Sequence, residues 1–291
     1  MRKKEEKFWP KKLLDYAVKI DLIWLVIWGT IFISFVVLDS IFQTAYPGEN
    51  VFYELDLGAK HIVIKVVENG TFVGVTLLKY IGIILSFIYA RKKFPRDYIL
   101  QIALAFTLLA DTILTFDQVS RFGVLAFCFA QYFHLARFAK IKPKYFVGYT
   151  LMMLLVLIFA NLAKIEDMYA LAFIYAFSLG GNLYLTHQWW TKVKAKHPKT
   201  FIPKTEREKY DRELVASTCA FWGFFFFILC DMNVALSYLS VTGTIAPEIA
   251  RYANFFAWLF YYPSQVLISN SSVITGRPIS KKSLKKVHVL K

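Results

Sequence analysis

Long apolar runs alternate along the chain with shorter polar segments that carry most of the charge. An α-helix needs about 20 mainly apolar residues to cross a bilayer. Eight runs approach that length: Ile20–Gln43, Thr71–Ala90, Tyr98–Phe116, Phe122–Ala139, Tyr145–Ala163, Met168–Trp190, Leu214–Val241 and Tyr252–Ser271. The pattern predicts an all-α polytopic membrane protein whose eight transmembrane helices occupy residues 20–272.

Two of the polar segments carry further information. The third and fourth runs are separated only by Asp117–Arg121, which predicts a tight antiparallel hairpin. The longest external segment, about residues 44–70, contains the alternating sequence HIVIKVV. Alternation of this kind is typical of a short strand, and it also suits a segment that lies against the membrane.

The distribution of Lys and Arg predicts how the helices are oriented. With the N-terminus in the cytoplasm, 29 of the 35 Lys and Arg residues fall in cytoplasmic segments and 5 on the opposite side. Cytoplasmic loops of membrane proteins carry such an excess of basic residues. We therefore expect both termini, residues 1–19 and 273–291, to be basic cytoplasmic segments. The expected location is a membrane, and the plasma membrane if the source is bacterial.

Composition agrees with a membrane protein, since 57% of residues are hydrophobic and the mean hydropathy is +0.46. A soluble domain would have to hide this apolar surface from water. The net charge of +15 does not predict a nucleic-acid partner, because the basic residues lie in clusters between apolar runs. The cysteines lack CxxC or Cys/His spacing, so we predict no disulfide, no metal site and no cofactor.

Two carboxylates, Asp111 and Asp231, lie well inside their predicted helices. An ionisable group within a bilayer is costly, and each is therefore a candidate functional residue. The alternative is a structural role in which the carboxyl group bonds to a neighbouring helix. Asp39 lies near a helix end and carries less weight, whereas Lys79 is expected to snorkel or to pair with a carboxylate.

Several uncharged polar side chains accompany the two aspartates. The candidate site residues among them are Gln131, His134, Asn254, Tyr261, Tyr262 and Gln265, whereas Asn182 and Asn233 are given no role. A rise of about 1.5 Å per residue places most of these groups in the middle and outer half of the bilayer, where one cavity could hold them. The spacing of Asn254, Tyr261 and Gln265 puts them on one helix face. For Gln131 and Asn254 the alternative role is a hydrogen bond between helices. For His134 the alternative is a position in the headgroup zone.

Three segments resemble motifs of the YhhN-like lysoplasmalogenase family. In LLADTILTFDQVSRFGVLAFCFAQYFHLARF the matching residues are Ala110, Asp111, Leu114, Gly123, Phe127 and Ala130. WGFFFFILCDMNVAL is similar to the family's second aspartate motif, and FYYPSQVLI to its terminal Tyr-Tyr-x-x-Gln-x-Leu-Ile motif. The chain departs from the pattern at Gln131, where the family has His, and at His134, where it has Tyr. The resemblance covers about residues 71–271.

The resemblance implies hydrolysis of the vinyl-ether bond of lysoplasmalogens to a fatty aldehyde and a glycerophospho-base. Asp111 and Asp231 would then be the acid and its carboxylate partner. The tyrosines, Gln265 and Gln131 would orient water or substrate. The expected partners are a lysophospholipid and the bilayer. A second interpretation is a non-enzymatic protein that binds or transports a lipid or small amphiphile through the same cavity.

Overall fold

The structure is a computed structural model. It describes residues 22–45, 51–56, 61–68, 71–116, 120–139, 145–196, 204–241 and 246–273. The predicted basic segment at residues 1–19 lies outside the described residues, and so does the predicted segment 273–291 apart from Val273.

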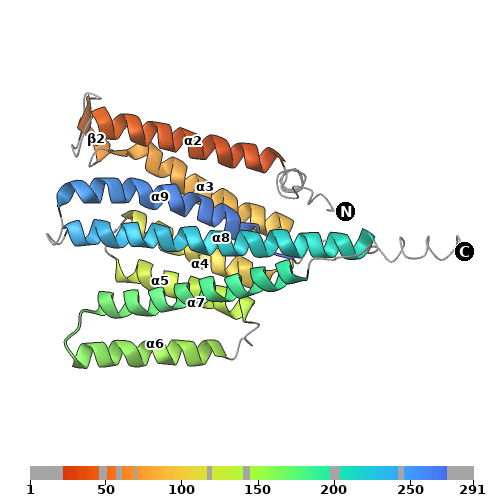
Figure 1. Cartoon of the computed structure of the whole chain (residues 1–291). Coiled ribbons are helices and arrows are strands. Elements are labelled where there is room, and N and C mark those ends of the chain that lie inside the picture. The colour runs from red at the N-terminus through yellow and green to blue at the C-terminus, as the bar shows by residue number, and fades with distance from the viewer. Residues whose placement is uncertain are drawn as a thin grey trace, which may run out of the picture. The chain divides into compact units, whose positions relative to one another are not determined.

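The described residues contain eight helices, labelled in Figure 1. They are α2 (Leu22–Ala45), α3 (Val73–Lys93), α4 (Tyr98–Phe116), α5 (Arg121–Phe138), α6 (Tyr145–Leu162), α7 (Asp167–Ala195), α8 (Lys204–Val241) and α9 (Pro247–Ser269). Each corresponds to one predicted apolar run, and α4 has the predicted bounds. Helix α8 begins earlier than predicted because its first residues are polar but are good helix formers, such as Glu206, Arg207 and Glu208.

Five of the described helices are long and apolar enough to cross a membrane by length and composition: α2, α3, α4, α7 and α8. Helix α6 contributes a shorter apolar segment, Val147–Leu162. The chain is therefore an integral membrane protein. The count of eight spans and the cytoplasmic position of both termini stay predictions.

The segment that was predicted to be external forms a small sheet, which the all-α class does not include. It consists of β1 (Val51–Asp56), β2 (His61–Glu68) and β3 (Thr71–Phe72), antiparallel and in the order β1-β2-β3. The alternating sequence HIVIKVV forms β2, with Val63 opposite Glu54 of β1. Of the two interpretations of this segment, the strand is confirmed.

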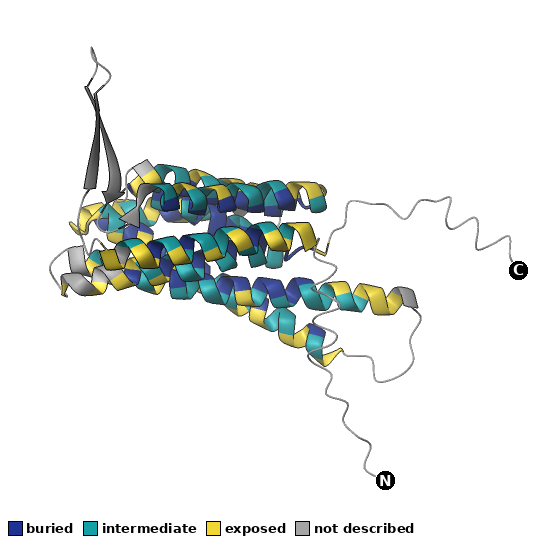
Figure 2. Ribbon diagram, turned by 90° about the horizontal axis from the view of Figure 1, so that it is seen from above, coloured by how far each residue is buried: buried dark blue, intermediate teal, exposed yellow. Residues whose placement is uncertain are grey.

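Exposed positions recur along the helices (Figure 2). Many of them carry large apolar side chains, such as Phe159, Leu162 and Phe177, which are at least 70% exposed. Such side chains in water would form costly patches, whereas lipid is their natural environment.

The chain divides into two compact units. The first comprises Met1–Ile84 and Leu229–Val266, and the second comprises Leu85–Ile228 and Leu267–Lys291. Helices α3, α8 and α9 contribute to both. Asp111 belongs to the second unit and Asp231 to the first.

The first unit is organised around the ring of Tyr262 on α9. Its hydroxyl donates to the backbone oxygen of Trp28 on α2 at 3.3 Å, and its ring lies 5.4 Å from that of Phe35. A Cβ added at Gly82 of α3 would overlap the same ring. The glycine therefore permits α3 to approach α9 closely at this point.

The second unit is built on α5. Helix α4 packs on α5, which packs on α7, and α6 packs on α7. Cys128, Met153, Leu171 and Ile174 form a buried apolar cluster from α5, α6 and α7. At the start of α5, a Cβ on Gly123 would lie 2.5 Å from Leu114 Cγ of α4. This close approach confirms the tight hairpin.

Candidate functional site

Asp111 is buried on α4, at 9% exposure, and the preceding Ala110 is fully buried. Thr115, one turn further, donates its hydroxyl to the Asp111 backbone oxygen at 2.7 Å, so that hydroxyl stays on its own helix. The fold thus retains a carboxylate inside an apolar helix of the second unit.

Asp231 lies on α8 in the first unit and is half-buried, directly after the buried Cys230. Asn233 donates its side-chain amide to the backbone oxygen of Leu229 at 2.7 Å. This amide is therefore held by its own helix. Because the two aspartates belong to different units, their common cavity stays a prediction.

Gln131 on α5 is completely buried and bonded to Asn182 of α7. The Asn182 Nδ2 atom donates both to the backbone oxygen of Gln131, at 3.0 Å, and to its Oε1, at 2.9 Å. The bond between helices that the sequence left open for Gln131 is thus present. Asn182 was not among the predicted site residues, although a buried amide on a neighbouring helix was the signal that could have found it.

His134 lies one turn beyond Gln131 on α5 and is 1% exposed. Its ring stacks on Phe138 and meets Phe224 of α8 edge-on, with centroids 5.1 Å apart in the second case. Its Nδ1 atom has no hydrogen-bond partner in the described part of the chain. His134 is therefore held among aromatic rings.

The four candidates on α9 differ in burial. Tyr261, Tyr262 and Gln265 are buried, whereas Asn254 is exposed although it lies on the same helix face as Tyr261 and Gln265. The Gln265 amide donates to the Ser264 hydroxyl at 3.4 Å. The protein therefore covers this face at the C-terminal half of α9 and leaves it open near Asn254.

The sequence predicted only one partner of the buried ion pair between Lys79 and Asp39. Lys79 Nζ lies 2.5 Å from Asp39 Oδ2, and both side chains are almost completely buried. The ammonium also lies 5.1 Å from the ring centroid of Trp258 and 5.5 Å from that of Phe35. Lys79 was predicted either to snorkel or to pair with a carboxylate, and the structure shows that it pairs with one. Asp39, given little weight because of its place near a helix end, is the partner.

A second buried network lies in the other unit, and the sequence analysis did not predict it. Arg137 Nε donates to Asp97 Oδ2 at 3.1 Å, and its Nη1 and Nη2 donate to the hydroxyl and backbone oxygen of Ser271 at 2.8 and 2.7 Å. The Ser272 hydroxyl donates to Asp97 Oδ2 at 2.7 Å. These contacts join the ends of α4, α5 and α9. Arg137 lies near the end of the predicted helix Phe122–Ala139, and Asp97 directly precedes the predicted helix Tyr98–Phe116.

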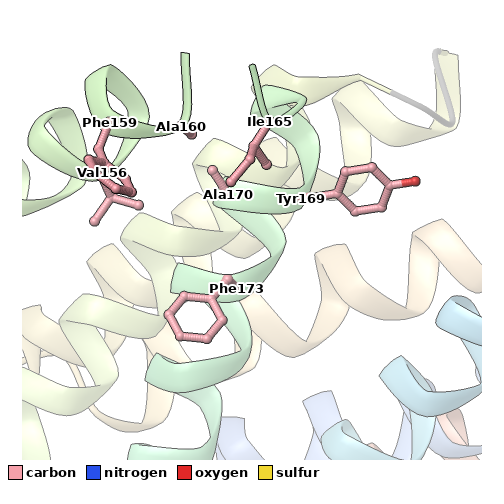
Figure 3. Close-up of a pocket in the computed structure, with 7 residues that line it drawn as sticks. All are labelled: Val156, Phe159, Ala160, Ile165, Tyr169, Ala170 and Phe173. Atoms are coloured by element: carbon pink, nitrogen blue, oxygen red, sulfur yellow. The ribbon is translucent and has the colours of Figure 1, made fainter. Parts of the chain in front are cut away.

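A groove of about 200 Å³ lies between the facing ends of α6 and α7 (Figure 3). Its lining is almost entirely apolar: Val156, Phe159, Ala160, Ile165, Tyr169, Ala170 and Phe173. It offers no carboxylate, amide or imidazole, so it is unsuited to acid–base chemistry.

The described residues contain no group of three or more His, Cys, Asp or Glu side chains that could hold a metal ion. The candidate residues buried inside the helices offer carboxyl, amide, imidazole and phenol groups, which suit hydrogen bonding and proton transfer.

No curated protein and no solved structure matches the chain. A family model described as the YhhN family matches residues 74–272. The matched segment includes both aspartates, Gln131 and the buried end of α9, and it leaves out α2 and the sheet. Because the match spans well over half of the sequence, the chain belongs to the YhhN family.

Proposed function

We propose that the protein hydrolyses the vinyl-ether bond of lysoplasmalogens or closely related lysolipids. The observation that carries the proposal is the burial of Asp111 within an apolar helix of a YhhN family chain. A carboxyl group within a membrane helix is energetically costly, so its presence there marks a candidate functional residue.

The chemistry suits a pair of carboxyl groups. One donates a proton to the vinyl carbon that is not bonded to oxygen, which leaves an oxocarbenium ion. The other stabilises that cation and accepts a proton from the attacking water. The hemiacetal formed then breaks its bond to the glycerol oxygen, which takes up a proton, and releases a fatty aldehyde. Asp111 and Asp231 would share these tasks. Different surroundings would keep one carboxyl group protonated and the other ionised.

The remaining candidates would bind and orient. Tyr261, Tyr262 and Gln265 offer hydrogen bonds from the buried part of α9, and His134 and Gln131 from α5. None of these roles needs a charge. They would hold the lysolipid or the attacking water in the geometry that the proton transfers require.

The test uses the purified full-length protein with two substrates that differ in one bond. A 1-alkenyl lysophospholipid should release aldehyde, and the matched 1-alkyl lysophospholipid should not, because only the vinyl ether is activated by protonation at carbon. An absence of aldehyde from the alkenyl lipid in a folded preparation would contradict the proposal.

A second function is favoured by one residue. Gln131 stands where the family has a titratable His, and an amide binds without transferring protons. A protein that binds or transports a lipid or amphiphile would retain 1-alkenyl lysophospholipid, and the lipid would be recovered intact from the complex.

A further inference from the structure

The two amide groups of Gln131 and Asn182 have only one possible orientation. Asn182 Nδ2 lies 3.0 Å from the backbone oxygen of Gln131, and a carbonyl oxygen only accepts hydrogen bonds. The atom of Asn182 that faces α5 is therefore its nitrogen. That nitrogen also lies 2.9 Å from the Gln131 side chain, so the atom it contacts there is the oxygen.

This arrangement leaves one donor and one acceptor. Gln131 Nε2 and Asn182 Oδ1 are buried and have no hydrogen-bond partner within the described residues. Both residues are 0% exposed. Buried polar atoms in folded proteins almost always have a partner, so these two atoms point to a ligand.

The polar side chains next to Asn182 on α7 do not supply that partner. Thr186, one turn later, donates its hydroxyl to the backbone oxygens of Asn182 and Leu183 at 2.8 and 3.0 Å. Ser178, one turn earlier, donates to the backbone oxygen of Ile174 at 2.8 Å and lies 2.9 Å from the Tyr149 hydroxyl. Both hydroxyl groups are engaged elsewhere.

We propose that Gln131 Nε2 and Asn182 Oδ1 form a binding site for a hydroxyl group, and that Asn182 is the residue that positions it. A hydroxyl both accepts and donates, so it satisfies the amide nitrogen and the amide oxygen together. The ligand is either a bound water or the free glycerol hydroxyl of a lysolipid. The second source rests on the proposed function. Position 131 then presents a fixed donor, which binds substrate or water and does not transfer protons.

The experiment compares density maps of the full-length protein in lipid nanodiscs, alone and with a 1-alkyl lysophospholipid. This ligand keeps the glycerol hydroxyl and is not a vinyl ether, so the result does not depend on hydrolysis. Density within hydrogen-bond distance of both Gln131 Nε2 and Asn182 Oδ1 is the expected result. Absence of such density from both maps would overturn the proposal, whether or not the protein is a hydrolase.

Binding measurements separate the two sources of the hydroxyl. If it belongs to the lipid, the wild type binds the 1-alkyl lysophospholipid at least about tenfold more tightly than the analogue without the glycerol hydroxyl, as expected for one well-placed hydrogen bond. Gln131→Met and Asn182→Leu, which keep side-chain volume, should abolish this preference. If it is water, both lipids bind alike, and the isolated density disappears in Gln131→Met.

The matched control is Thr186→Val, which removes a buried hydroxyl that bonds only to its own helix. It should retain both the density and the lipid preference. If a Gln131 or Asn182 variant does not fold, the wild-type maps decide the proposal by themselves.

Discussion

The Arg137 guanidinium bonds Asp97 through Nε at 3.1 Å while its two Nη atoms hold Ser271. Asp97 Oδ1 in turn accepts the backbone N–H of Leu100 at 3.1 Å, which caps the start of α4. One buried arginine therefore ties the end of α9 to the loop before α4. The network lies at the predicted cytoplasmic ends of these helices.

Replacing Arg137 should destabilise the second unit. Arg137→Leu leaves the Asp97 carboxylate buried without its partner, and breaking a buried pair in this way typically costs about 3–5 kcal/mol. A melting curve in detergent should show a clear drop in the melting temperature. Arg121→Leu is the control, because Arg121 pairs with Asp167 at 3.5 Å and the two side chains are 65% and 39% exposed. Equal effects of the two changes would contradict the assigned role.

Gly82→Ala should destabilise the first unit, because the new methyl group would overlap the buried ring of Tyr262. Overpacking of this kind costs about 1–3 kcal/mol. Gly148→Ala offers a matched control, since nothing lies within 4 Å of a Cβ added there and alanine favours the helix. The melting temperature should fall for the first variant and hold or rise for the second.

Asp111→Asn and Asp231→Asn should each reduce aldehyde release by at least about 10²-fold, the lower end of the range for acid–base groups. Asparagine keeps the shape of aspartate but cannot deliver a proton. The melting temperature should hold or rise, because a neutral amide is less costly than a carboxylate in an apolar site. Asp167→Asn, at the first residue of α7 and with 39% of its side chain exposed, should leave turnover unchanged. Full activity in both variants would end the two-carboxylate mechanism.

Gln131→His should change the dependence of turnover on pH. Histidine titrates near neutral pH, whereas the amide of glutamine does not titrate. If position 131 faces the reacting groups, the variant gains an ionisation between about pH 5 and 8 that the wild-type profile lacks. An unchanged profile would restrict Gln131 to joining α5 and α7.

The predicted orientation is open to cysteine labelling in intact cells. An impermeant maleimide should label a cysteine placed in residues 44–70 and should not label Lys282→Cys. The native thiols Cys128, Cys219 and Cys230 are buried, so the background should be low. Labelling of Lys282→Cys from outside would overturn the eight-helix topology.

The sequence predicts the ends of a helix correctly wherever the apolar run and the helix end at the same residue. For α4 they coincide at Tyr98 and Phe116, because polar segments begin at both ends. For α8 they separate, since Lys204–Glu213 is polar and yet helical. An apolar run marks only the part of a helix that suits lipid. The polar part of the same helix lies outside the run and is therefore missed.

The buried pairs were harder to foresee for a different reason. Asp97 and Arg137 lie next to predicted helix ends, where charges normally face water. Only the packing of α4, α5 and α9 removes that water. Asp39 and Lys79 lie on consecutive helices, α2 and α3. Which faces of these helices meet depends on the rotation of each helix about its axis, and the sequence pattern does not specify that rotation.

Lys79 and Asp39 also link a part of the chain that the family model matches to a part that it does not match. Lys79 lies inside the segment that the YhhN family model matches, and Asp39 lies on α2, outside it. A lysine within a membrane helix is costly, up to about 2.5–3.5 kcal/mol on insertion when it lies at the helix centre. Helix α2 is synthesised first, so its carboxylate is already present when Lys79 leaves the ribosome. Helix α2, outside the family match, thus supplies the carboxylate that lowers the cost of Lys79 within α3.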